Sequence, residues 1–138
     1  MLAVFTVSNL FDAGAGSLRQ AIIDSNANGG GFDTIELSSV TGTIELLNEL
    51  PDITGAVELA GPGAGELTID AGSQFRVFDV TPTGDLTISR LTVTGGQVLG
   101  AGGGIRNLGG ALTVEASVIT GNVTLGAGGV GGGIYSTG

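Results

Sequence analysis

Internal repetition constrains the fold of this chain more than any other feature of its sequence. The segment 85–96 (DLTISRLTVTGG) matches 111–122 (ALTVEASVITGN) at an offset of 26 residues. The segment 102–107 (GGGIRN) matches 131–136 (GGGIYS) at an offset of 29 residues, so about three residues are inserted between the two matched blocks. A period of roughly 20–50 residues is typical of solenoids, in which each repeat buries its apolar face against its neighbours.

Two earlier blocks extend the series towards the N-terminus. The block 57–80 aligns with the block after it at offsets of 24 to 29 residues, and the segments 34–37 and 43–46, both TIEL, indicate one further coil. The repeats therefore fill residues 34–138 with about four coils. A solenoid needs at least about three to bury a continuous core.

Within each repeat, apolar residues alternate with threonine in short runs bounded by glycine. Leu86 and Ile88 flank Thr87, for example, and a period of two is typical of a β-strand. We therefore predict an all-β fold, a right-handed single-stranded parallel β-helix. Ile88 and Val114 should then lie in one interior row of neighbouring coils, about 4.8 Å apart. A β-sandwich is the alternative, but it needs longer strands and no fixed offset between like residues.

The first 33 residues depart from the repeat, and we expect them to cap the coils within one structural domain (1–33 cap, 34–138 coils). Residues 4–7 indicate a short strand, and 17–26 indicate a helix in which Ser17 is the N-cap and Gln20 closes a capping box. Three glycines at 29–31 should end the helix. Its apolar residues lie on one face and should cover the open first coil: Leu18, Ala21 and Ile22.

Composition excludes several classes of function. The chain contains no cysteine, histidine or lysine. It thus lacks the usual zinc ligands and the residues of thiol, Ser–His and Schiff-base catalysis, and we predict no metal site, no cofactor and no catalytic residue. The net charge of −9 disfavours binding to nucleic acid and to anionic lipid. No apolar run approaches the roughly 18 residues of a membrane span, so we expect no membrane insertion by this segment.

The order of several motifs resembles a family of bacterial surface proteins. The motifs are SLRQAI at 17–22, DTIEL at 33–37, LTVTG at 91–95 and GGGI at 102–105. They resemble the N-terminal region of secreted right-handed β-helix proteins that begin with a Cys-Ser-Leu-Arg-Glu-Ala-like segment, and of the polymorphic outer-membrane, autotransporter-like group. Gly16 stands in place of the cysteine. The resemblance implies a structural or adhesive, non-enzymatic function outside the cell or on its outer surface.

Some β-helices cleave polysaccharides, so a carbohydrate-binding or polysaccharide-cleaving function is the alternative. Asp70, Asp79 and Arg76 are the only plausible set of catalytic side chains, and a surface ion pair of Arg76 is the simpler interpretation. The glycines at 126–131 spell G-x-G-x-x-G, but no helix follows, so we interpret them as a solenoid corner. Surface glycans are the corresponding partner.

The last residues repeat an internal strand without any motif that resembles a cap. We therefore expect an uncapped last coil with unpaired strand edges. Such a coil can be covered by the remainder of a longer β-helix, by a second copy in an end-to-end dimer, or by the next copy in a head-to-tail fibre. The self-association residues predicted on this basis are Ile134 and Tyr135.

Overall fold

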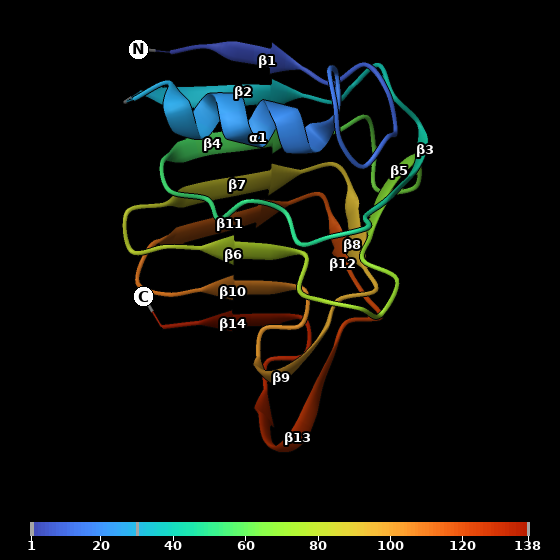
Figure 1. Cartoon of the computed structure of the whole chain (residues 1–138), viewed down its shortest axis with the longest axis vertical. Coiled ribbons are helices and arrows are strands. Elements are labelled where there is room, and N and C mark those ends of the chain that lie inside the picture. The colour runs from blue at the N-terminus through green and yellow to red at the C-terminus, as the bar shows by residue number, and fades with distance from the viewer. Residues whose placement is uncertain (1, 30, 138) are drawn as a thin grey trace.

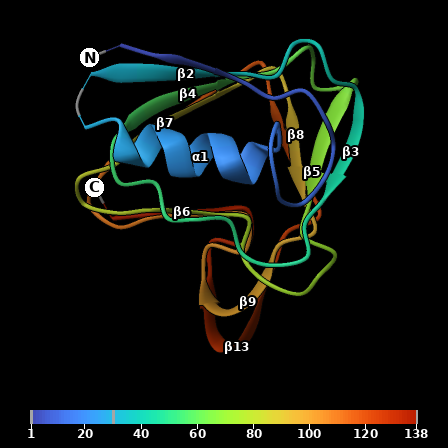
Figure 2. The ribbon, with the colours of Figure 1, turned by 45° about the horizontal axis from the view of Figure 1, so that its top comes forward.

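The chain forms a parallel β-helix, whose computed structural model describes residues 2–29 and 31–137. Successive coils run through three faces of strands and stack along one axis (Figure 1). Seen with the N-terminal end forward, β2 (Phe32–Glu36), β3 (Gly42–Glu45) and the return to β4 (Ala56–Ala60) run clockwise away from the viewer (Figure 2). The helix is therefore right-handed, and the predicted fold class is confirmed.

Sheet A is the longest of the parallel sheets and contains one strand from every level of the stack. Its strands follow in the order β1 (Val4–Thr6), β2, β4, β7 (Asp85–Ser89) and β11 (Ala111–Glu115). The four coils expected from residue 34 onward are confirmed, and β1 adds a fifth strand at the N-terminal end.

Sheets B and C complete the other two faces, and a two-stranded sheet D projects from the corner between them. Sheet B contains β3, β5 (Leu67–Asp70), β8 (Thr92–Thr94) and β12 (Val118–Ile119). Sheet C contains β6 (Phe78–Val80), β10 (Ile105–Asn107) and β14 (Ile134–Ser136), with Ile53 bridging to Val80 in the coil before. Sheet D contains β9 (Gln97–Ala101) and β13 (Val123–Val130).

Alternate residues of each strand point inward and form rows of like side chains along the axis. In sheet A the pairings run Phe5–Ile35, Ile35–Leu59, Leu59–Ile88 and Ile88–Val114. The predicted neighbours Ile88 and Val114 are thereby confirmed, as is the pair Ile105–Ile134 in sheet C. Thr68 pairs with Thr92, which places Leu67 beside Leu91, and both leucines are fully buried. The three middle members of the sheet A row have no exposed surface.

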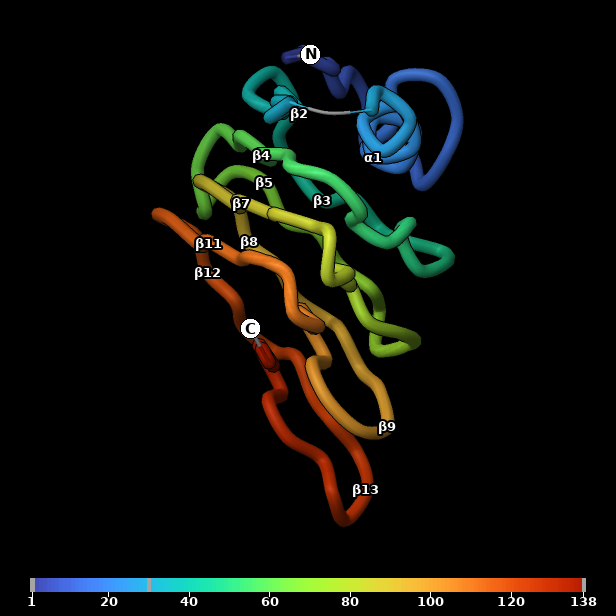
Figure 3. The backbone as a smooth tube through the Cα atoms, turned by 90° about the vertical axis from the view of Figure 1, so that its left-hand side faces the viewer, coloured from blue at the N-terminus to red at the C-terminus, as the bar shows by residue number. Residues whose placement is uncertain are grey.

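The projecting arm explains why the repeat length changes. In sheet D the register runs from Val123–Gln97 to Leu125–Leu99 and then jumps to Val130–Ala101. The offset thus rises from 26 to 29 residues inside the arm, where the sequence places its insertion. The glycines at 126–131 were predicted to form a corner, but residues up to 130 belong to β13 and extend this arm (Figure 3).

Helix α1 (Leu18–Ala27) begins and ends as the sequence predicts. Ser17 is extended, with ψ at 159°, and its side chain accepts a hydrogen bond from the backbone N–H of Gln20. The second half of the predicted capping box is wrong. The side chain of Gln20 donates to Asp24, and the Ser17 N–H instead donates to the carbonyl of Gly14 at 3.1 Å. Gly29 follows the C-cap with φ at +71°, a conformation that glycine adopts without strain.

The inward face of α1 closes the N-terminal end of the core. Leu18, Ala21 and Ile22 are all buried and belong to the same apolar cluster as the inward residues of the coils. Figure 2 shows α1 lying across the end of the stack, inside the outline that the three faces make. The helix therefore occupies the place that a strand of sheet C takes in later coils.

A buried carboxylate ties this cap together. Asp33 is 2% exposed and occupies an inward position of β2, where it pairs with Val57. It accepts hydrogen bonds from the Ala3 N–H at 3.1 Å, the Ser25 hydroxyl at 2.9 Å and the Asn28 side-chain amide at 2.9 Å. One side chain thus joins the strand β1, the helix α1 and the strand β2.

A second polar contact holds the loop before α1 against the following coil. Asp12 Oδ1 lies 2.8 Å from Arg19 Nη2 and accepts the Leu47 N–H at 2.8 Å. Burial raises the pKa of Asp12, but these hydrogen bonds and the charge of Arg19 outweigh it, so the pKa lies below its usual value of 3.8.

We expect Asp12→Asn to lower the melting temperature near neutral pH. Because the pKa of Asp12 is lower in the folded than in the unfolded chain, its stabilising effect is complete above the unfolded value of 3.8 and is lost as the pH falls through the folded value. The difference in melting temperature between wild type and variant should be constant above about pH 5 and shrink towards about pH 3. Glu115→Gln, on the exposed face of β11, is the control, and a gap that widens in acid would contradict the assignment.

Candidate functional site

The candidate catalytic set of the sequence separates into a surface ion cluster and a turn residue. Arg106 binds Asp79 through both carboxylate oxygens, at 3.0 Å from Nε and 2.6 Å from Nη2. Arg76 Nη1 lies 3.7 Å from the same carboxylate. Asp70 belongs to sheet B and accepts the Gly72 N–H at 2.8 Å. The expectation that Asp70 joins this group is wrong, because the corner between β5 and β6 places them on different faces.

The remaining donors of Arg76 hold the coil that follows. Its Nε donates to the carbonyl of Gly102 at 2.8 Å and its Nη2 donates to the carbonyl of Ala101 at 2.9 Å. Burial and the neighbouring Arg106 charge lower the pKa of Arg76, although Asp79 and the carboxylates of Glu49 and Asp52 oppose them. These contacts agree with the simpler interpretation of Arg76 as an ion-pair residue that fastens one coil to the next.

Arg106 was missed by the sequence analysis, although the repeat contains the signal for it. Asp79 and Arg106 pair directly in the parallel register of β6 and β10, so they are equivalent residues of successive coils. Opposite charges at paired positions of neighbouring strands stabilise a sheet. The hydrogen bond from Arg106 to Asp79 is the main reason that the pKa of Arg106 lies above its usual value, although burial opposes it.

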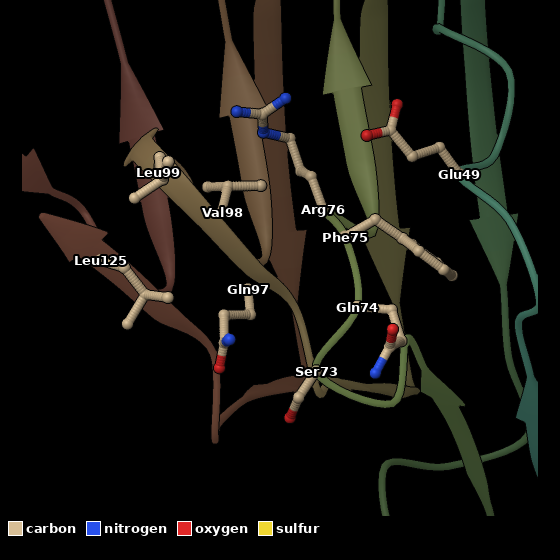
Figure 4. Close-up of a pocket in the computed structure, with 9 residues that line it drawn as sticks. All are labelled: Glu49, Ser73, Gln74, Phe75, Arg76, Gln97, Val98, Leu99 and Leu125. Atoms are coloured by element: carbon tan, nitrogen blue, oxygen red, sulfur yellow. The ribbon is translucent and has the colours of Figure 1, made fainter.

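A groove of about 420 Å³ lies between this cluster and the projecting arm (Figure 4). Its residues come from the segment before β4, the corner before β6, and both strands of sheet D. They combine apolar, amide and charged side chains: Glu49, Ser73, Gln74, Phe75, Arg76, Gln97, Val98, Leu99 and Leu125. Leu99 is 77% exposed and Leu125 is 42% exposed, so the arm presents an apolar wall to solvent. The sequence analysis missed this groove because it depends on the arm.

The predicted self-association residues lie on the last strand of sheet C. Ile134 pairs with Ile105 and Tyr135 pairs with Arg106. Ile134 ends an inward row in which Phe78 and Ile105 are 1% and 0% exposed, but it is itself 39% exposed. The last coil thus leaves the end of this row uncovered in the part of the chain that the structure describes.

Comparisons of the chain with protein-family models, with curated protein sequences and with solved structures found no match. Within residues 2–29 and 31–137, none of the helices has the length and apolar character that crossing a membrane requires. The same residues contain no group of three or more acidic side chains placed to hold a metal ion.

Proposed function

We propose that this chain is a structural or adhesive β-helix of the cell exterior that associates through its last coil. The observation that carries the proposal is that three inward rows end uncovered there. Ile88 and Val93 are fully buried, whereas Val114 and Ile119, their partners in the last coil, are only half-buried. Ile134 ends the third row. Apolar side chains in such a cross-section favour contact with another protein surface.

The distribution of exposed apolar side chains supports the same proposal. Of the large apolar residues that are exposed, nearly all come from the two ends of the stack or from the arm: Leu2, Val4, Phe11, Ile23, Phe32, Leu99, Val118, Val123, Leu125, Val130 and Ile134. Leu47 is the exception, on the side of the coils. A rod with polar sides and apolar ends favours contacts along its axis.

The exterior location rests on the resemblance to bacterial surface proteins. Protease treatment of intact source cells tests it directly. Loss of the full-length chain, while a cytoplasmic marker stays intact, is the expected result. Protection of the chain until the cells are lysed would argue against an exterior location.

We expect Ile134→Lys to weaken self-association more than tenfold. Covering an apolar side chain of this size contributes about 1.5–3 kcal/mol, and a tenfold change in affinity corresponds to about 1.4 kcal/mol. Sedimentation velocity over a range of concentrations measures the effect. Leu47→Lys is the matched control, because Leu47 is 74% exposed and lies away from the last coil. A wild-type chain that stays monomeric throughout would overturn the proposed association.

Glycan binding is the second candidate, and the groove beside Arg76 is the observation that favours it. Phe75 offers an apolar surface, and Gln74 and Gln97 offer amide donors and acceptors beside it. Screening on a glycan array, repeated with Gln97→Ala, tests this function, and release of an unsaturated uronide would reveal cleavage. Unaltered binding by the variant would exclude the groove as the glycan site.

A further inference from the structure

The two free edges of sheet A show how copies of this chain fit together. We infer that copies stack head to tail, with β1 of one copy pairing in parallel with the free edge of β11 of the next. This inference rests on the proposed self-association and adds its geometry. Its partner is a second copy of the same chain, and its interface joins the two ends of one sheet.

The backbone groups of the two edge strands are complementary. The Thr34 N–H donates to the Ala3 carbonyl and the Val7 N–H donates to the Glu36 carbonyl, both at 2.9 Å. Because alternate residues of a parallel strand face each neighbour, Val4 and Thr6 direct their N–H and C=O groups away from β2. On β11, Ala111 and Glu115 bond to the β7 side in the same manner.

Leu112 and Val114 therefore direct their backbone groups to the free edge of β11. Since all strands of sheet A run in one direction, a copy displaced along the axis brings its β1 beside β11 in the parallel orientation. No reversal of the chain is needed, and the ladder of hydrogen bonds continues from one copy into the next.

The side chains also continue in register. Extending the pairings of sheet A places Phe5 of the next copy over Val114, Val4 beside Thr113 and Thr6 beside Glu115. Phe5 and Val114 are the two half-buried ends of one inward row. Stacking therefore covers both ends of the row at once, each with an apolar partner.

The rest of the two ends agrees with this arrangement. A groove of about 210 Å³ lies between β1 and α1 at the N-terminal end, lined in part by Val4, Phe5 and Ala21. Beyond Arg106, Glu115 carries the only charged side chain in the sequence. The last coil thus offers a nearly uncharged surface to an end that is partly apolar.

A two-fold contact between two last coils fits less well. Turning one coil over about an axis across the stack reverses the order of its three faces, so only one sheet meets its own counterpart. The other two sheets then meet each other, which breaks their rows. Head-to-tail stacking keeps the order of the faces.

Disulfide cross-linking between copies tests the register, because the chain has no cysteine of its own. Val4→Cys and Thr113→Cys are prepared as separate variants, mixed and oxidised. Paired residues of neighbouring strands lie about 4.8 Å apart at their Cα atoms, within the span of roughly 4.4–6.8 Å that a disulfide bridges. Ala111→Cys replaces Thr113→Cys in the control mixture, since it is exposed on the same face but two residues out of register. Thermal melts establish that each variant is folded.

We expect a mixed disulfide dimer from the Val4→Cys and Thr113→Cys mixture, at least about fivefold more abundant than in the control mixture. Cross-linking of Thr113→Cys with itself at the same level would overturn the head-to-tail arrangement in favour of a two-fold contact. Equal yield from the Ala111→Cys mixture would overturn the register. If the wild type associates without any mixed cross-link, only this inference fails; if the wild type never associates, the proposed association itself fails.

A variant without cysteine provides a second measurement. Val4→Pro removes an N–H that faces the free edge of β1, and proline is tolerated at such edge positions. Head-to-tail stacking predicts that Val4→Pro weakens association at least tenfold, although it lies at the opposite end from Ile134. Association equal to that of the wild type would contradict the involvement of β1.

Discussion

Replacing Ile22 by aspartate is expected to remove most or all of the stability of the fold. Ile22 is 1% exposed on the inward face of α1. An unpaired carboxylate in this position costs several kcal/mol, against a total free energy of unfolding of about 5–15 kcal/mol for a typical domain. We expect the melting temperature to fall by more than about 10 °C. Loss of the cap should also expose strand edges and cause aggregation.

The neighbouring residue of the same helix gives a matched control. Ile23 is 44% exposed, so Ile23→Asp places the same charge on the outward face of α1. Its effect should stay within about 0.5 kcal/mol. Thermal melts followed by circular dichroism compare the two variants. If Ile22→Asp melts at the same temperature as Ile23→Asp, the helix does not close the core.

Asp33→Ala is expected to destabilise the chain by about 3–5 kcal/mol, because it leaves donors in the cap without their charged acceptor. The Ala3 N–H, the Ser25 hydroxyl and the Asn28 amide all lose a hydrogen bond to this carboxylate. The expected result is a lower midpoint of urea denaturation, together with earlier hydrogen exchange in β1 than in the later coils.

Asp33→Asn separates the charge from the hydrogen bonds. The amide oxygen can accept from Ala3 and Asn28, and the Ser25 hydroxyl can turn to accept from the amide nitrogen. We therefore expect a cost of about 1–2 kcal/mol, which reflects the lost charge. Equal losses for Asp33→Ala and Asp33→Asn would mean that the charge, and not the hydrogen-bond geometry, holds the cap.

The register of the coils is the part of the fold that sequence reasoning predicts best. The offset of 29 residues from Val57 to Leu86 reappears as a direct pairing of β4 with β7. This succeeds because stacked coils must bring like residues into one row, so similarity at a fixed offset reports spatial contact. The same logic contains the pair Asp79–Arg106, whose unlike side chains hide their equivalence from a search for similar residues.

Asp33 shows where such reasoning ends. The alternation in TIEL at 34–37 correctly predicts Ile35 and Leu37 as inward residues, and both are fully buried. Extending the alternation backwards by one step would place a carboxylate inside the core, an apparent contradiction from sequence alone. The position is stable only because β1 and α1 supply donors from segments up to 30 residues away.

The groove beside Arg76 could not be predicted for a related reason. Its wall is formed by Leu99 and Leu125, whose strands leave the regular outline of the coil. Periodicity describes what the coils share, and the arm is what they do not share. The site therefore depends on local chain length at one corner.

That corner also shows how a protein of this kind tolerates change. Between two paired positions of the arm, four residues on β13 lie opposite a single residue on β9, yet Ile105 and Ile134 still pair directly afterwards. Added length is absorbed at the tip and is not transmitted to the next rung. Insertions and deletions during evolution are thus permitted here at little cost to the core. A foreign peptide grafted between Gly126 and Gly129 would be displayed on a stalk with the interior rows unchanged.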